Sequence, residues 1–162
     1  MLFWFVGFAV VGVWYVFRDP KFDVRILVLG VLLPDVVDAP FGGARAMHSL
    51  TVSVVVLLAV VLVTIGRRGA RKRWLALPIG MFFHLVADGA FALTQTFWWP
   101  FGGWAFPDEP LPSVARGWWN VPLELAGLAA IGWAWKRFGL SNPEHRRRVV
   151  RDGTLPMPHE LA

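Results

Sequence analysis

The chain has 162 residues, of which 56% are hydrophobic and only 17% charged, and its formal net charge is +5. So apolar a composition is unusual for a water-soluble domain of this length and is typical of a membrane protein. The sequence contains no cysteine, which excludes disulfides, thiolate metal sites and a cysteine nucleophile, so a metal site would use nitrogen and oxygen ligands.

Five apolar stretches follow one another along the chain, and each predicts a transmembrane helix. A hydrocarbon core about 30 Å thick needs roughly 20 apolar residues in a helix, and several stretches approach this length. The second contains Pro34 near its end, so its helix could be kinked or re-entrant. The predicted fold is an all-α integral membrane bundle with helices at residues 1–17, 22–38, 49–65, 74–97 and 116–138.

Basic residues set the expected orientation of this bundle. They concentrate in residues 66–74, GRRGARKRW, and in the tail from Lys136 to Arg151, and loops rich in Lys and Arg stay on the cytoplasmic side. We therefore expect a multi-pass protein of the plasma membrane, with its N-terminus outside and residues 139–162 as a loosely ordered, basic cytoplasmic tail. The lipid bilayer is its expected partner. Nucleic-acid binding is not expected, and no oligomeric state is predicted.

Ionisable residues stand inside these apolar stretches or at their ends. His84 and Asp88 are four positions apart in GMFFHLVADGAF, so a helix places them on one face. An ionisable group inside a span costs roughly 2.5 to 3.5 kcal/mol, and such residues commonly mark functional sites. In the expected topology four further residues reach the same half of the membrane: Asp35, Asp38, His48 and Glu124.

Each of these residues also has an ordinary structural explanation. Aspartates near Pro and Gly commonly form turns, and His48 could simply begin a helix. His84 and Asp88 could form one hydrogen bond that holds the bundle, and Glu124 could be protonated and bonded to a carbonyl. Together, however, His and carboxylate side chains on facing helices match the metal sites of helical bundles. The spacing favours a metal site and leaves open an ion or proton pathway and a purely structural cluster.

The string LLPDVVDAPFGGARAMHSL, followed after one apolar stretch by GMFFHLVADGAFALTQTFWWPF, resembles the membrane-bound metal-dependent hydrolases of the YdjM-like group in bacteria and archaea. That family combines LPD and a second nearby aspartate, a loop ending in HSL, and a G-x-x-x-H-x-x-x-D helix leading to W-P. The resemblance covers residues 30–101. It implies that the metal ligands or catalytic residues are Asp35, Asp38, His48, His84 and Asp88.

This chain differs from the commonest pattern of that family. Its first apolar stretch has no histidine, its loop reads GGARAMHSL without the HRG that many members carry, and its aspartates form D-x-x-D rather than D-x-D. A single metal ion, or a site that has lost catalysis, fits these departures better than a multinuclear site.

The resulting hypothesis is a membrane-embedded, metal-dependent hydrolase of a phosphoester or lipid-type substrate. One divalent ion, zinc by this ligand chemistry, would have a coordination position open to water and be held by Asp35, His48, His84 and Asp88. Asp38 or Glu124 would be the general base, and Arg45 could pair with a phosphate. The alternative is a non-catalytic membrane protein whose His/Asp cluster is structural or organises partners, so enzymatic activity stays open.

Overall fold

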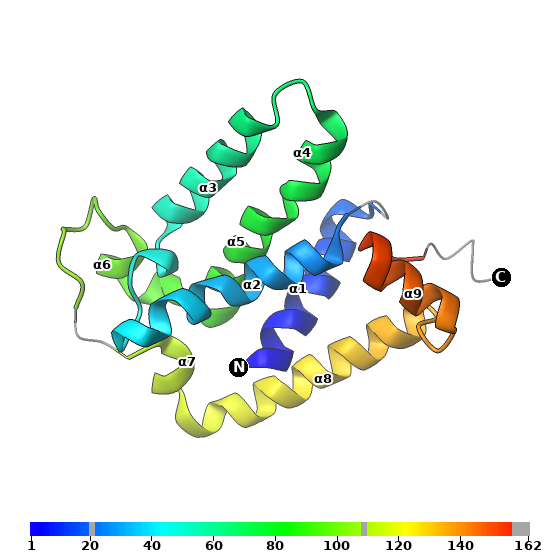
Figure 1. Cartoon of the computed structure of the whole chain (residues 1–162). Coiled ribbons are helices and arrows are strands. Elements are labelled where there is room, and N and C mark those ends of the chain that lie inside the picture. Colours follow the sequence, from blue (N-terminus) through cyan, green and yellow to red (C-terminus); the bar gives the residue numbers. More distant parts are fainter. Residues whose placement is uncertain (20–21, 108–109, 157–162) are drawn as a thin grey trace.

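Helices form all of the regular secondary structure in the residues that the structure describes, which are 1–19, 22–107 and 110–156 of this computed structural model. Five helices lie inside the five apolar stretches (Figure 1): α1 (Leu2–Phe17), α2 (Val24–Asp38), α3 (Leu50–Val63), α5 (Ala76–Asp88) and α8 (Asn120–Arg137). The remaining helices are α4 (Arg68–Trp74), α6 (Thr94–Phe97), α7 (Pro112–Ala115) and α9 (Pro143–Asp152). Short 3-10 turns are η1 (Ala39–Phe41), η2 (Ala46–His48), η3 (Ala90–Ala92) and η4 (Gly117–Trp119).

The helices are shorter than the apolar stretches that contain them. Arg18, with φ 48° and ψ 29°, ends α1 in the left-handed conformation, and Gly89, with φ 66°, ends α5 after 13 residues. α8 has 18 residues, but it carries Glu124 near its start and Lys136 and Arg137 in its last turn. Among the described residues, no helix combines the length and the apolar character that a bilayer crossing requires.

This finding corrects the predicted fold class. The protein is all-α, but the prediction of transmembrane helices is wrong. The plasma-membrane localisation, the outside N-terminus, the cytoplasmic placement of residues 139–162 and the lipid bilayer as a partner depend on those spans and are wrong with them. A crossing needs about 20 consecutive residues in one helix, and an apolar composition does not show where each helix ends.

The segment after α8 is more ordered than the sequence predicted. The side chain of Asn142 caps α9 by accepting a hydrogen bond from the Glu144 N–H at 2.9 Å. Leu155 is buried in a small apolar cluster against the end of α8. A loosely ordered tail is therefore wrong for residues 139–156, while residues 157–162 of that prediction lie outside the described part of the chain.

α2 and α5 pack with their backbones in direct contact. A side chain at Gly30 would overlap the carbonyl oxygen of Leu77, and a side chain at Gly80 would overlap that of Leu27. Only glycine permits so close an approach. The contact brings the C-terminal half of α2 beside the C-terminal half of α5, where the predicted ligands of both helices lie.

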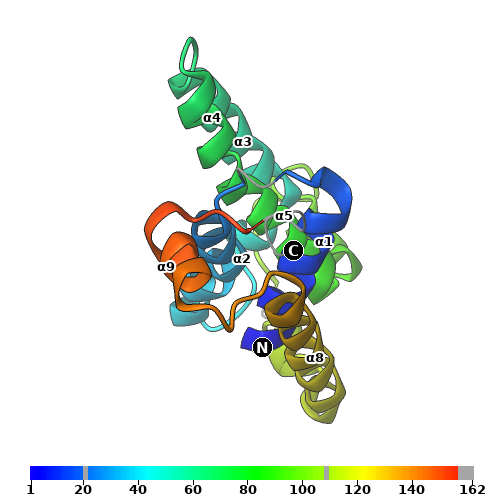
Figure 2. The same ribbon diagram turned by 90° about the vertical axis from the view of Figure 1, so that its right-hand side faces the viewer.

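α1 packs against α2 and α5 with one face and against α8 with another. Phe5 and Ala9 of α1 are fully buried in the same apolar cluster as residues of α2 and α5. A side chain at Gly7 of α1 would overlap the backbone of Gly127 in α8, and one at Gly127 would overlap the backbone of Phe3 in α1. α8 therefore lies on the far side of α1 from α5, at the end of the molecule opposite α3 and α4 (Figure 2).

The pair formed by α3 and α4, which we call the α3–α4 arm, extends away from the other helices (Figure 1). The two helices run side by side and are joined by a turn that contains Gly66 in the left-handed region, at φ 77°. The arm is attached at its base, where η2 precedes α3 and where α4 leads into α5.

Candidate metal centre

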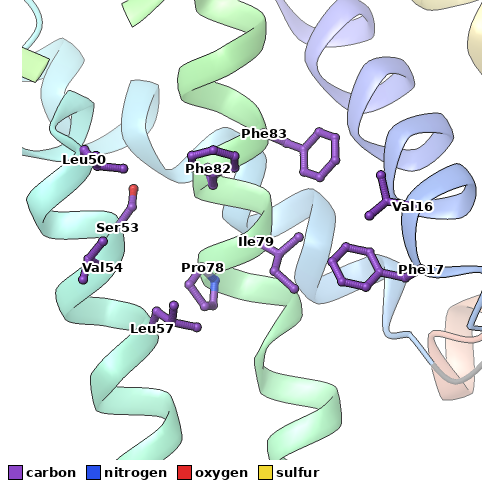
Figure 3. A pocket seen from close by; sticks show the side chains of 10 residues that line it. All are labelled: Val16, Phe17, Leu50, Ser53, Val54, Leu57, Pro78, Ile79, Phe82 and Phe83. Carbon is purple, nitrogen blue, oxygen red and sulfur yellow. The ribbon is translucent and has the colours of Figure 1, made fainter. Parts of the chain in front are cut away.

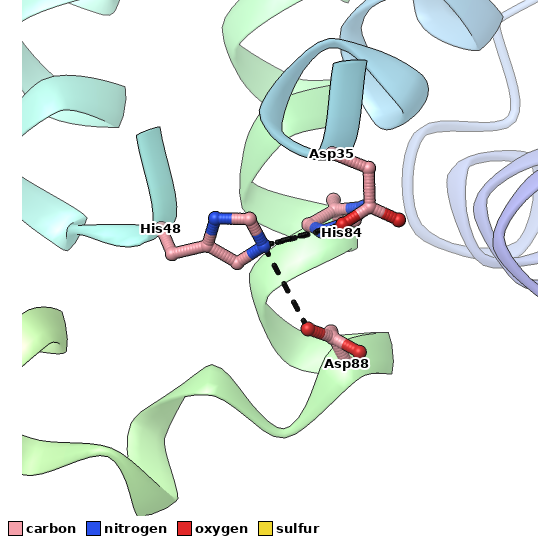
Figure 4. Close-up of side chains that lie close together, drawn as sticks. All are labelled: Asp35, His48, His84 and Asp88. Atoms are coloured by element: carbon pink, nitrogen blue, oxygen red, sulfur yellow. Dashed lines mark hydrogen bonds and ion pairs between the residues drawn. The ribbon is translucent and has the colours of Figure 1, made fainter. Parts of the chain in front are cut away.

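Two histidines and two aspartates from three parts of the fold meet at one point (Figure 4). Asp35 comes from α2, His48 from η2, and His84 and Asp88 from α5. One ligand atom of each residue lies within 4.8 Å of those of the other three. The side chains of His48, His84 and Asp88 are fully buried, whereas 22% of the Asp35 side chain is exposed. The structure thus brings together the four predicted ligands in a cluster that could hold a metal ion.

The separations between the facing atoms suit a small ion. His48 Nε2 lies 3.3 Å from Asp35 Oδ1, 3.3 Å from His84 Nε2 and 3.8 Å from Asp88 Oδ2. His84 Nε2 lies 3.6 Å from Asp35 Oδ1. Neighbouring ligands of tetrahedral zinc, with bonds near 2.0 Å, stand about 3.3 Å apart. Three of the four atoms, from Asp35, His48 and His84, are therefore spaced as zinc ligands are, while Asp88 Oδ2 lies farther out, within 4.8 Å of the others.

Two carboxylate oxygens at this point have no hydrogen-bond donor. Asp35 Oδ1 and Asp88 Oδ2 are buried, and no described residue donates a hydrogen bond of acceptable geometry to either atom. Leaving a buried polar atom unsatisfied costs about 1 to 3 kcal/mol, so such atoms are rare and call for an explanation. Both atoms face the common point, which a positive ion would satisfy.

α2 supplies two aspartates because Pro34 does not end it. The helix continues to Asp38, so the re-entrant alternative considered for it is wrong, and Asp35 and Asp38 lie one turn apart on the same side. They flank the two ring nitrogens of one imidazole: Asp35 Oδ1 is 3.3 Å from His48 Nε2, and Asp38 Oδ2 is 2.7 Å from His48 Nδ1.

Each imidazole is held through its Nδ1 atom. His84 Nδ1 lies 2.7 Å from the Val31 carbonyl oxygen, which can only accept, so Nδ1 carries the proton and Nε2 keeps its lone pair. His48 Nδ1 donates to Asp38 Oδ2, which also accepts the Arg45 N–H at 2.8 Å. Both Nε2 atoms therefore face the centre. Outer partners of this kind fix the tautomer and the orientation of metal-binding histidines.

The turn before α3 fixes the position of His48. Ser49 follows it, and its hydroxyl oxygen caps α3 by accepting a hydrogen bond from the Val52 N–H at 3.2 Å. The same hydroxyl donates to the Ala46 carbonyl at 2.7 Å. Ser49 is thus a helix cap that holds the 3-10 turn η2 against the start of α3.

Without an ion, the two histidines and Asp88 differ widely in their pKa values. Burial alone would lower the pKa of His48, but the adjacent carboxylates of Asp35 and Asp38 raise this pKa to about 9. Burial lowers the pKa of His84 to about 4, and the positive charge of His48 acts in the same direction. Burial raises the pKa of Asp88 to about 7. At neutral pH, His48 is therefore protonated and His84 is neutral.

The other predicted site residues lie around the centre or away from it. Asp38 stands behind His48, as described above. Glu124 lies at the start of α1, where its Oε2 accepts the N–H groups of Phe3 at 2.8 Å and Trp4 at 3.3 Å. It therefore satisfies free N–H groups of a helix end and is not among the clustered ligands. The Arg45 guanidinium donates to the Phe41 carbonyl at 3.2 Å.

Sequence reasoning missed Arg116. Its Nη2 atom donates at 2.5 Å to both the carbonyl oxygen and Oδ1 of Asp88. No short motif connects the two residues, which are separated by a Pro- and Gly-rich segment. A buried aspartate requires a cationic partner nearby, so the existence of such a partner could be predicted. The sequence did not indicate which arginine it would be.

A separate apolar cavity of about 380 Å³ lies between α3, α5 and the end of α1 (Figure 3). Its walls include Phe17, Leu57, Ile79 and Phe82, and Ser53 is a polar side chain among them. At 100° per residue, Ile79 and Phe82 project from the side of α5 opposite the metal ligands. This cavity is therefore not the reaction site.

Comparison with protein-family models, with curated proteins and with solved structures finds no match. What the centre does is therefore inferred from its own geometry and chemistry: the four convergent ligand atoms, the outer partners of the two imidazoles, and the arginine bound to Asp88.

Proposed function

We propose that this protein binds one divalent ion, zinc by preference, and uses it to hydrolyse a phosphate ester. The observation that carries the proposal is the convergence of four ligand atoms, two of them carboxylate oxygens without a hydrogen-bond donor among the described residues. Two imidazole nitrogens and two carboxylate oxygens form a ligand set that zinc accepts readily. The order LPD, HSL and G-x-x-x-H-x-x-x-D, which resembles that of metal-dependent hydrolases, supports the same conclusion.

A purely structural polar cluster accounts for these observations less well. In such a cluster protonated His48 would face Asp35 Oδ1 at 3.3 Å, but the buried Asp88 Oδ2 would still lack a hydrogen bond among the described residues. The two Nε2 atoms, 3.3 Å apart, can share the proton of His48 in the metal-free state, and the bonds at Nδ1 leave both Nε2 atoms facing the same point. That orientation is the usual one for histidine ligands of metals, which donate Nδ1–H to a carboxylate or a carbonyl.

A divalent ion held in this way lowers the pKa of a water molecule and polarises a phosphoryl oxygen. The residues of the chain have distinct parts in this chemistry. Asp38, through its bond to His48 Nδ1, is a positioning residue rather than a base. The Asp35 side chain is 22% exposed although its Oδ1 atom is buried, so the centre lies nearest to the surface on the side of this ligand. Glu124 caps α1, and we give it no part in the reaction.

Elemental analysis of the purified protein tests metal binding. We expect about one zinc per chain, and its loss in His48→Ala and His84→Ala because each removes a ligand. Asp38→Asn should keep the metal but weaken its affinity about 10- to 100-fold, as for other outer partners. Asp152→Asn is the matched control, because this carboxylate is 47% exposed, forms an ion pair with Arg151 and belongs to α9 rather than to the centre.

Hydrolysis of a chromogenic phosphate ester should require the bound metal, disappear with His84→Ala, and survive Asp152→Asn. Circular dichroism must show that each variant remains folded. A wild-type protein that binds no divalent metal, while both histidine variants keep their helices, would leave the polar-cluster alternative as the correct one.

A further inference from the structure

A second polar feature adjoins the metal centre. Arg116 lies directly after α7 and is mostly buried, with 24% of its side chain exposed. Its Nη2 atom holds Asp88 through both the carbonyl oxygen and Oδ1, so that Oδ2 of the same carboxylate turns to the cluster. Arg116 therefore contacts a residue that would bind the proposed ion, without contacting the ion itself.

The guanidinium of Arg116 has donors to spare. Its Nη1 atom faces the Met1 sulfur at 3.5 Å, and a thioether is a weak acceptor. Within the described part of the chain, neither Nη1 nor Nε is bonded to an oxygen. A guanidinium offers five N–H donors in a planar fork that fits the oxygens of phosphate, and only part of this fork is used by Asp88.

A cavity of about 500 Å³ opens beside this pair. Asp88 and Arg116 are the charged residues among its described lining, and apolar groups including Phe91, Leu93 and Pro112 form the rest. Its size lies in the range of small-molecule sites, which are mostly apolar with a few polar groups that fix orientation. The cavity therefore combines one cationic group, one proposed metal ligand and an apolar wall.

We propose that Arg116 receives the phosphoryl group of the substrate and that the apolar wall receives its organic part. This inference rests on the proposed function and names its substrate class, a phosphate ester of an apolar alcohol. A phosphoryl group has enough oxygens to face the ion and Arg116 at the same time. When the Asp88 charge is shared with an ion, its hold on the guanidinium weakens, which favours transfer of the free donors to the incoming anion.

Binding of inorganic phosphate and of hexyl phosphate to the zinc-loaded protein, measured by calorimetry, tests this assignment. In Arg116→Gln, we expect the affinity for both ligands to fall about tenfold or more, because a charge-assisted bond is lost. Arg116→Lys should be intermediate, since it keeps the charge and loses the fork. Arg137→Gln is the control, because this arginine lies over the Trp14 ring, away from the cavity.

A cavity-filling variant tests the apolar wall separately. Ala92 lines the cavity, and Ala92→Trp should lower the affinity for hexyl phosphate more than the affinity for inorganic phosphate. Equal binding of the two ligands by the wild-type protein would overturn the assignment of the apolar wall.

The outcomes separate this inference from the proposed function. If Arg116→Gln and Arg116→Lys keep their zinc and bind phosphate as the wild type does, the inference fails and the proposed function stands. If both variants lose zinc but, once reloaded with excess zinc, bind phosphate normally, Arg116 only supports Asp88 and the inference also fails. If the wild type binds no zinc, the proposed function fails. Arginine-dependent phosphate binding by the metal-free protein would then still support the anion site, and its absence would overturn it.

Discussion

The two imidazoles of the centre are chemically different although their Nε2 atoms lie only 3.3 Å apart. His48 sits between two carboxylates, which raise its pKa to about 9. Burial lowers the pKa of His84 to about 4, although the Val31 carbonyl that accepts from its Nδ1 acts in the opposite direction. One proton thus occupies the space where an ion would bind, and proton and ion must compete for His48 Nε2.

This competition predicts how metal affinity depends on pH. Because the pKa of His48 is about 9 without metal, zinc binding at pH 8 should release about one proton, and affinity should rise about tenfold per pH unit between pH 8 and pH 9. The pKa of Asp88 is raised to about 7, so Asp88 releases a second proton when zinc binds below neutral pH. The zinc affinity therefore depends more steeply on pH in that range. Calorimetry in buffers of different ionisation enthalpy measures the proton count. A zinc affinity that is constant from pH 6 to 9 would contradict the protonation of His48.

At the scale of helices, the contact between α2 and α5 determines whether the ligands can meet. Gly30 and Gly80 let the two backbones touch, and His84 follows Gly80 by one helical turn. Each ligand bond tolerates deviations of only a few tenths of an ångström. The glycines therefore position the metal centre even though neither contacts it.

A methyl group at this contact should damage both stability and binding. Because the Cβ of Gly80→Ala would overlap the Leu27 carbonyl, we expect the free energy of unfolding to fall by about 1 to 3 kcal/mol and the zinc affinity to fall with it. Gly132→Ala is the control, because no atom lies within 4 Å of its added Cβ, and alanine should stabilise this interior position of α8 by about 0.5 to 1 kcal/mol. Chemical denaturation measures both variants. If Gly80→Ala and Gly132→Ala changed the free energy of unfolding equally, the α2–α5 contact would not be tight.

At the scale of the whole molecule, Asp23 connects segments that are far apart in sequence. Its carboxylate caps α2 and accepts bonds from Arg25 at 2.9 Å and from Arg73 of α4 at 2.8 Å. Arg25 in turn donates to two carbonyls of α9, and the Val24 N–H donates to the Gly153 carbonyl at 2.8 Å. This group of bonds lies at the N-terminal end of α2, about 18 Å along the helix from Asp35.

Removing this carboxylate should lower stability without changing metal binding. Burial alone would raise the pKa of Asp23, but the guanidinium groups bonded to it hold the pKa below its usual value of 3.8. The stability that it contributes is therefore present above about pH 4 and lost as the pH falls below that value. Asp23→Ala should reduce the free energy of unfolding at pH 7 by about 1 to 3 kcal/mol, a difference that narrows in acid.

Zinc affinity should remain at the wild-type value in Asp23→Ala, because the substituted residue is remote from the ligands. Urea denaturation at pH 7 and at pH 3, with zinc titration of the same samples, checks both expectations. A stability difference that persists undiminished at pH 3 would show that the ionised form of Asp23 is not what stabilises the fold.

The sequence was sufficient to locate helices and to select the four clustered residues. The i, i+4 spacing of His84 and Asp88 is a property of one helix, and turn residues around His48 restrict where it can lie. The membrane prediction was wrong because the ends of the helices depend on local backbone conformations, such as left-handed Arg18 and Gly89, which overall hydrophobicity does not report. Glu124 shows the same limit, because its depth along a helix does not reveal what it faces.

The position of the metal centre has one more consequence, for the α3–α4 arm. Its base is flanked by His48 on one side and α5 on the other. An ion shared by Asp35 and Asp88 would close a loop of 53 residues, 88 minus 35, that contains the whole arm. By the loop-closure relation for disulfides, a cross-link of this span restricts the unfolded chain by about 4 kcal/mol. In a chain without cysteine, and therefore without disulfides, a bound zinc ion would be the cross-link that stabilises the fold in this way.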